Sequence, residues 1–141
     1  KAVGEGGFLE HASVHGHYYG TPKAPVMSQL KAGRDVILEI DVQGAMQVKE
    51  SYPDGVFIFI LPPSVDALRS RIMHRGTESE EDIQVRLGAA QREMEYLEHY
   101  DYYVVNDDLE KAVDSVKKIM AAEHWKVTDA AGILKRIKGE E

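Results

Sequence analysis

The sequence predicts an α/β fold built on a parallel sheet. Three short runs have the apolar, largely β-branched or aromatic composition of buried strands, at residues 36–42, 56–61 and 102–105. The segments between and after these runs repeat apolar residues at helical spacing. Strands that alternate with helices are typical of a parallel sheet covered by helices.

Composition sets limits on the class of protein. The 141 residues are enough for one domain with its own core, and the absence of cysteine excludes disulfides and thiol chemistry. Lys and Arg number 17 against 24 Asp and Glu, and the net charge of −7 opposes general binding to nucleic acid or to an anionic membrane. No run approaches the roughly 20 apolar residues of a membrane helix, and no signal peptide is evident. We therefore expect a cytoplasmic protein.

The chain begins with a small β element that differs from the βα alternation behind it. Residues 1–22 combine glycine-rich turns with short strand-like runs. A short helix is expected at 25–32, because Pro25 suits its first turn and Gly33 follows its end.

Two strands buried on both faces are expected next, at 36–42 and 56–61. A short helix at 44–51 separates them and ends before Pro53, and Pro62 ends the second strand.

The second half is predicted to be mainly helical. Ser64 should cap a helix that stops at Gly76, and Ser79 should open a longer one. An apolar stripe supports the longer helix, at Ile83, Leu87, Ala90, Met94 and Leu97. After the strand at 102–105, an amphipathic helix should begin at Asp107 and reach Trp125, and a weaker helix is expected at 128–138.

Five motifs stand out together: F-L-E-H-A-S-V-H-G-H-Y-Y-G-T (8–21), L-E-I-D-V-Q-G-A (38–45), F-I-L-P-P-S (59–64), R-I-M-H-R-G-T-E-S-E-E (71–81) and V-N-D-D (105–108). In this order and spacing the sequence closely resembles guanylate kinase, the nucleoside-monophosphate kinase that phosphorylates GMP with ATP and Mg²⁺. The resemblance runs from about residue 8 to about residue 126. It implies a P-loop kinase fold with flanking helices, a small β element for GMP and a helical lid.

The resemblance also implies an organisation along the chain. Residues 1–22 would form part of the GMP-binding β region, and 23–64 the core strands and helices. Residues 65–100 would form the lid and the helix after it, and 101–141 a core strand with the C-terminal helices.

Glu10 and Thr21 are of the right type to read guanine. Guanine offers N–H donors at N1 and N2, which match a carboxylate, and an acceptor at O6, which matches a hydroxyl. By resemblance, Glu10 reads the base, Thr21 binds O6 and Tyr19 holds the GMP phosphate. Without the resemblance, Glu10 would be interpreted as a surface acid and Tyr19 as a packed aromatic.

Glu39 and Asp41 lie two residues apart in an apolar run, so both should face one side of the predicted strand. Acids in a buried strand need a cation or hydrogen-bond donors, and ligands bind at the carboxyl ends of such strands. By resemblance, Asp41 contacts guanine and Glu39 lies near the water shell of Mg²⁺. The alternative is a pair of edge acids that face solvent.

Three arginines surround the predicted joint between two helices. Arg71 and Arg75 share one helix face, and Arg86 follows on the next helix. Guanidinium groups match phosphate oxygens, so the three could converge on one polyphosphate. By resemblance they are catalytic lid arginines that contact ATP and the transferred group, and Asn106 lies beside the adenine. Without the resemblance, the arginines would be interpreted as solvated surface residues and Asn106 as a turn residue.

No resident metal site is expected from the histidines. His15 and His17 form a possible pair, but no third ligand follows at a suitable spacing, and a hairpin turn explains them more simply.

The family's phosphate-binding loop, G-x-x-x-x-G-K-[ST], has no counterpart, because none of the 12 glycines precedes Lys-Ser or Lys-Thr. In the family the strand before that loop lies between those that 36–42 and 56–61 resemble. We therefore expect the chain to be a portion of a longer protein, without kinase activity alone.

Three functional hypotheses follow: guanylate kinase acting on GMP and ATP, a non-catalytic guanylate-kinase-like module that binds proteins, and an inactive fragment. Glu10, Asp41 and the lid arginines favour the enzyme, because a scaffold needs no phosphoryl-transfer lid. No nucleic-acid or membrane partner is expected.

Overall fold

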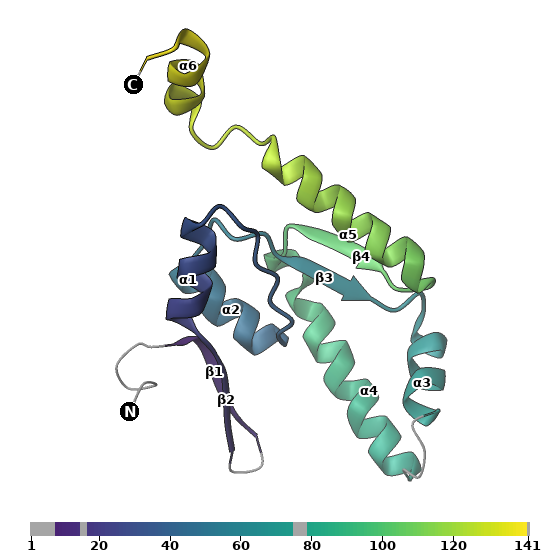
Figure 1. The fold of residues 1–141 in the computed structure, drawn as a ribbon. Helices are drawn as coiled ribbons and strands as arrows, with labels where there is room; N and C mark the ends of the chain where they lie inside the picture. The colour runs from purple at the N-terminus through teal and green to yellow at the C-terminus, as the bar shows by residue number, and fades with distance from the viewer. Residues whose placement is uncertain (1–7, 15–16, 75–78, 141) are drawn as a thin grey trace. The chain divides into compact units, whose positions relative to one another are not determined.

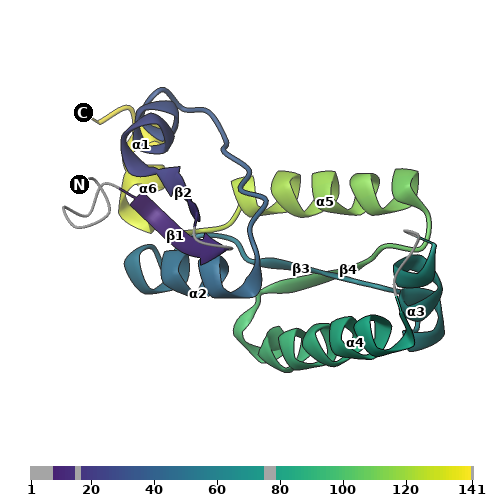
Figure 2. The ribbon, with the colours of Figure 1, turned by 90° about the horizontal axis from the view of Figure 1, so that it is seen from below.

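The computed structural model describes residues 8–14, 17–74 and 79–140. Figures 1 and 2 show two views of its elements, and the first half of the chain is mixed while the second is mainly helical. The elements are β1 (Phe8–Val14), β2 (His17–Pro22), α1 (Lys23–Lys31), α2 (Val42–Ser51), β3 (Ile58–Leu61), α3 (Val65–Met73), α4 (Glu80–Met94), the 3₁₀ helix η1 (Glu95–His99), β4 (Tyr102–Val105), α5 (Leu109–His124) and α6 (Ala130–Lys138).

Strands β1 and β2 pair antiparallel (Figure 1), which confirms the strand-like runs predicted for the start of the chain. Phe8 lies opposite Pro22, and Glu10 lies opposite Thr21. Leu9 therefore has no partner of its own across the pair, as in a β-bulge. The predicted turn at 15–16 lies outside the described residues.

A buried apolar cluster joins this hairpin to α2. Leu9 of β1 packs with Ala45 and Val48 of α2 and with Phe57, which precedes β3. Partly buried residues surround the cluster: Val26, Leu38, Ile40, Met46, Tyr52 and Tyr100. Burial of apolar side chains is the main force that stabilises such a unit.

Strands β3 and β4 are hydrogen-bonded neighbours and run parallel (Figure 2). The Tyr102 N–H donates to the Phe57 carbonyl at 3.1 Å, and the Asn106 N–H donates to the Leu61 carbonyl at 2.7 Å. Both partners advance along the chain together, so the strands point the same way. The predicted parallel arrangement of the sheet is confirmed for these two strands. Strand β4 has the predicted bounds, and β3 begins two residues late.

The strand predicted at 36–42 is wrong. Residues 36–41 form no strand, and α2 begins at Val42. Burial along the segment nevertheless alternates: Leu38 and Ile40 pack on the cluster, whereas Ile37 is 71% exposed. A strand needs a neighbour to accept and donate its backbone hydrogen bonds, and no described strand pairs with this segment.

Burial on both faces is also wrong for the strand predicted at 56–61, and the strand predicted at 102–105 is buried only in part. Within the described part of the chain, Val104 is the buried residue of β4, while Ile60 of β3 and Tyr103 are exposed. Within the described residues this sheet has two strands, so each of them has a strand neighbour on one side alone.

Serine caps open α3 and α4 at the predicted residues. Ser64 accepts a hydrogen bond from the Ala67 N–H at 3.0 Å, and Ser79 accepts one from the Asp82 N–H at 3.2 Å. The predicted end of the first of these helices, at Gly76, lies outside the described residues.

The apolar stripe of α4 holds for most of its length. Ile83 and Leu87 are buried, and Ala90 and Met94 are half-buried, but Leu97 is exposed. Leu97 belongs to η1, whose tighter winding no longer follows the spacing of the α-helical stripe.

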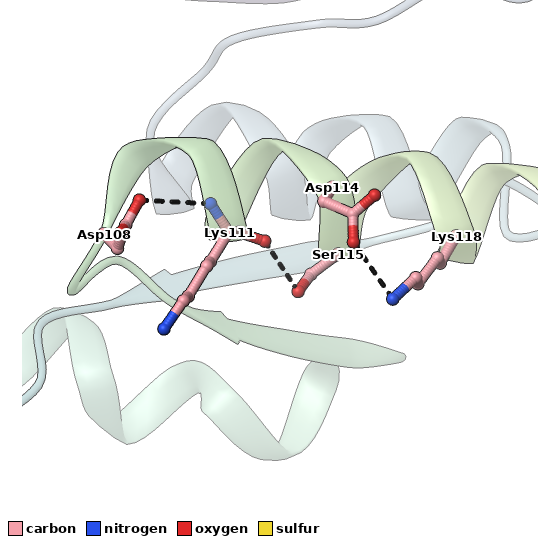
Figure 3. Close-up of polar contacts among 5 residues, drawn as sticks. All are labelled: Asp108, Lys111, Asp114, Ser115 and Lys118. Carbon is pink, nitrogen blue, oxygen red and sulfur yellow. Dashed lines mark hydrogen bonds and ion pairs between the residues drawn. The ribbon is translucent and has the colours of Figure 1, made fainter.

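Aspartates cap the last two helices. Asp108 accepts hydrogen bonds from the Glu110 and Lys111 N–H groups, the second of which is drawn in Figure 3. Helix α5 begins at Leu109, two residues after the predicted start at Asp107. Farther along α5, Lys118 forms a 3.0 Å ion pair with Asp114. Both side chains are exposed, so this pair contributes little to stability.

The chain divides into two compact units, one made of Lys1–Phe59 and Ser79–Tyr102, the other of Ile60–Glu78 and Tyr103–Glu141. Among the described helices, none combines the length and the apolar character needed to cross a membrane.

Phe57 is the large aromatic of the buried cluster, 7% exposed, and its ring meets that of Tyr100 edge to face. We predict that Phe57→Ala lowers the free energy of unfolding by about 3–5 kcal/mol, because it leaves a cavity. Urea denaturation followed by circular dichroism measures this loss. The control is Val85→Ala on the exposed face of α4, expected within about 0.5 kcal/mol of wild type. Equal losses in the two variants would contradict the assigned core.

Candidate functional site

Among the described residues, Glu10 is the one charged residue that is buried, with 8% of its surface exposed. The Thr21 hydroxyl donates to Glu10 Oε1 at 2.6 Å across the hairpin. A carboxylate removed from water needs such donors, and charge-assisted hydrogen bonds of this length are strong.

The bulge in β1 explains how two successive residues are both buried. Neighbours in a regular strand point to opposite faces. Here Leu9 packs in the apolar cluster, while Glu10, the next residue, turns to Thr21. The bulge thus anchors the hairpin through one side chain and presents a carboxylate with the next.

The first turn of α2 brings a second carboxylate to the same place. Asp41 is the N-cap of α2, and its Oδ1 accepts a hydrogen bond from the Gly44 N–H at 2.8 Å. The point where a Cβ would stand on Gly44 is 3.0 Å from Glu10 Oε2 and 3.3 Å from Asp41 Oδ1. Glu10, Thr21 and Asp41 therefore gather at one site, formed by the hairpin and the start of α2.

A cavity of about 360 Å³ lies beside Asp41. It is lined by Asp41, Val42, Gln43, Ala89, Arg92, Glu93 and Tyr96. Of the residues predicted to bind guanine, it includes Asp41 alone within the described part of the chain.

The pKa of the Tyr100 hydroxyl is affected by two acids that line this cavity, Asp41 and Glu93. Burial raises the pKa of the Tyr100 hydroxyl above its ordinary value, and the negative charges of Asp41 and Glu93 raise it further. The phenol is therefore protonated at neutral pH.

Two predicted site residues lie near this site in sequence. Tyr19 lies in β2 opposite Ala12, two residues before Thr21. Glu39 is exposed in the unpaired segment before α2, and Asp41 is exposed as well. The expectation that both acids lie in a buried strand is therefore wrong. Glu39 and Asp41 nevertheless lie on the same side of the segment. Both are exposed, whereas Ile40 between them is partly buried.

The second unit brings together two predicted residues that are 35 positions apart. Arg71 of α3 donates from Nη2 to the backbone carbonyl of Asn106, just after β4, at 2.7 Å. Arg86 lies on α4 in the first unit and is exposed. Arg75 lies outside the described residues. The described structure thus joins one predicted phosphate contact to the predicted adenine neighbour.

Comparison with known proteins decides the family. The guanylate kinase family model matches residues 1–123. The chain belongs to the guanylate kinase family.

Relatives named guanylate kinase match most of the chain. The protein of Caldanaerobacter subterraneus subsp. tengcongensis is 49% identical over 140 residues, which cover 99% of this chain and 68% of the relative. That of Clostridium tetani is 52% identical over 125 residues, with 89% and 60% covered. That of Desulfitobacterium hafniense is 57% identical over 119 residues, with 84% and 60% covered. The chain thus spans about three fifths to two thirds of the length of these relatives.

A solved guanylate kinase structure supports the fold. The crystal structure of guanylate kinase from Anaplasma phagocytophilum matches with a TM-score of 0.79 and 32% identity, covering 98% of this chain and 67% of that one. The predicted α/β fold of the guanylate kinase type is confirmed.

Sequence reasoning about this guanylate kinase family member misses one residue of the site, Gly44, and the effect of the Asp41 charge on Tyr100. The sequence pattern places Gly44 in a helix and gives Tyr100 no role. A glycine inside a helical pattern costs stability, and that cost is a signal of a packing or functional reason. Tyr100 carries no comparable signal, because its environment depends on residues distant in sequence.

We predict that Thr21→Val lowers the free energy of unfolding by about 1–3 kcal/mol, since it leaves the buried Glu10 carboxylate without its hydroxyl donor. Thr21→Ser is the matched control, because it keeps the hydroxyl. Urea denaturation at pH 7 compares the two. If valine and serine gave the same stability, the hydrogen bond would have no energetic role.

Proposed function

We propose that this chain supplies the GMP-binding element, lid arginines and core strands of an enzyme that transfers the γ-phosphoryl group of ATP to GMP, forming GDP and ADP. The observation that carries this proposal is the buried Glu10 carboxylate, held by the Thr21 hydroxyl beside Asp41. A buried acid with a hydroxyl neighbour is complementary to the polar edge of guanine.

The proposed contacts follow from the donors of the base. The Glu10 carboxylate accepts from guanine N1–H and N2–H. Asp41 uses Oδ1 to cap α2, which leaves its other oxygen to accept from the amino group. The Thr21 hydroxyl, which donates to Glu10 in this structure, rotates to donate to guanine O6.

Adenine fails at the same positions. Adenine N1 is an acceptor, so it and the Glu10 carboxylate would face each other without a proton to share. The 6-amino group of adenine would stand where guanine has O6, so the Thr21 hydroxyl would lose its acceptor. Unpaired buried polar groups cost about 1–3 kcal/mol each. Sites built on such groups therefore reject the wrong base strongly.

Positive charge for the phosphates comes from arginines. We assign Arg71, Arg75 and Arg86 to the ATP phosphates and the transferred group, where guanidinium forks pair with phosphate oxygens. Tyr19 is assigned to the GMP phosphate, two residues from Thr21 along β2. The hydrogen bond from Arg71 to the Asn106 carbonyl links a phosphate contact to the proposed adenine neighbour.

Glu39 fits a place near magnesium. Mg²⁺ prefers carboxylate oxygens and keeps several waters, and the exposed carboxylate of Glu39 suits a contact through those waters. When bound with ATP, the ion neutralises phosphate charge.

In the transfer itself, an oxygen of the GMP phosphate attacks the γ-phosphorus of ATP. The bond from that phosphorus to the bridging oxygen of ADP breaks, so that GDP and ADP are the products. The chain's residues orient the acceptor and stabilise charge, which are the main contributions of a protein to phosphoryl transfer.

The first test is an assay of GMP-dependent ADP formation. We expect none from this chain alone, and activity from the chain joined to a P-loop segment of a guanylate kinase, since the P-loop supplies positioning and a lysine. In the joined protein, Arg86→Ala should lower kcat much more than it raises KM for GMP. A folded, joined protein that binds GMP without turnover would instead favour the non-catalytic module.

The second test is calorimetric titration with GMP and AMP. We predict that the chain prefers GMP and that Glu10→Gln weakens GMP binding at least about tenfold, because the amide presents a donor where acceptors are needed. Glu50→Gln, an exposed position on α2, is the control and should bind as wild type does. Equal affinities for GMP and AMP would overturn the assignment of the base site.

A further inference from the structure

Gly44 occupies a position in α2 that has no room for a side chain. A Cβ built there would stand 3.0 Å from Glu10 Oε2 and 3.3 Å from both the Glu10 carboxyl carbon and Asp41 Oδ1. These separations are tighter than ordinary van der Waals contacts between carbon and its neighbours.

Backbone conformation does not explain a glycine here. Among the described glycines, positive φ occurs at Gly33 and Gly139, and Gly44 has the backbone of an ordinary helical residue. Glycine inside a helix costs about 1 kcal/mol relative to alanine. Glycine at position 44 therefore lowers the stability of α2. The space that a side chain would fill there is occupied by the Glu10 carboxylate.

We propose that Gly44 is the positioning residue that sets the place of the Glu10 carboxylate, and with it the preference for a purine that carries a 2-amino group. This inference rests on the proposed function, because it concerns the carboxylate assigned to guanine.

Glu10 has little freedom to give way to a methyl group on Gly44. In the chain without nucleotide its Oε1 is held by the Thr21 hydroxyl at 2.6 Å, and the preceding residue, Leu9, packs in the apolar cluster. The residue as a whole is also buried, with 8% of its surface exposed. A methyl group would displace Oε2 by a few tenths of an ångström and misalign the oxygens that guanine N1–H and N2–H require.

Gly88 offers a matched control. It also lies inside a helix, α4, and a Cβ there would meet only Nη1 of Arg92, at 3.3 Å, among the atoms that lie within contact distance. That atom is the far end of a flexible side chain. Gly88→Ala therefore gives the same gain in helix propensity without touching Glu10.

Thermal unfolding without ligand is the first readout. Gly88→Ala should raise Tm by about 2–5 °C, whereas Gly44→Ala should give no gain because it displaces a buried carboxylate. In a Glu10→Ala background, Gly44→Ala should recover the gain that Gly88→Ala shows. If Gly44→Ala raised Tm as much as Gly88→Ala in the wild-type background, the positioning role would be overturned, whatever the chain binds.

Calorimetric titration with GMP and with inosine monophosphate, which lacks the 2-amino group, is the second readout. Gly44→Ala should weaken GMP binding about tenfold and lower the ratio of GMP to inosine monophosphate affinity, while Gly88→Ala changes neither. In a Glu10→Gln background, Gly44→Ala should have little further effect on GMP, because both changes act on one group.

The outcomes separate this inference from the proposed function. If the wild-type chain showed no preference for GMP over AMP, the proposed function would fail, and the Tm comparison would still decide whether Gly44 positions Glu10. If the wild-type chain preferred GMP and Gly44→Ala kept both the affinity and the ratio, this inference alone would be wrong. If Gly44 had a purely structural role, Gly44→Ala would lower the affinity for GMP and for inosine monophosphate by the same factor. Its effect would then add to that of Glu10→Gln, and this inference would be wrong.

Discussion

A carboxylate removed from water must be met by donors and given space, and Glu10 imposes both requirements on the elements around it. The donor is the Thr21 hydroxyl, which lies opposite Glu10 in the register of β1 and β2. The space is left by Gly44, at the first turn of α2. Hairpin register, helix position and side-chain choice are thus coupled through one charged group.

Hydrophobic burial keeps this polar arrangement in place. Leu9, the residue before Glu10, packs with Ala45 and Val48, which lie one residue and four residues beyond Gly44. The same contact that stabilises the unit therefore fixes the distance between the carboxylate and α2. A site held by its own core loses little conformational entropy when a ligand binds, and this is the physical meaning of preorganisation.

The segment before α2 shows what a strand loses without a neighbour. Residues 36–41 keep the alternating burial of an extended chain, with Leu38 and Ile40 on the cluster. The side chains of this segment pack on the cluster without a neighbouring strand. A β-strand cannot form in this way, because its backbone N–H and C=O groups need hydrogen-bond partners from another segment. Asp41, at the end of this segment, satisfies a backbone N–H of α2 instead.

The family, the parallel character of the sheet, the bounds of β4 and the serine caps of α3 and α4 could all be predicted from the sequence. Chemical type pointed to Glu10 and Thr21, and the family resemblance pointed to Asp41, as candidate residues of one site. These features depend on local pattern, on capping residues within three positions and on motifs that can be read in order. Three features could not be predicted and emerge in the folded chain: the bulge at Leu9, the closeness of Gly44 to Glu10 and the absence of a strand at 36–41. The bulge and the closeness of Gly44 to Glu10 depend on residues far apart in the sequence, and a strand at 36–42 depends on a neighbouring strand. The spacing and composition of a segment do not specify where such residues or strands will lie.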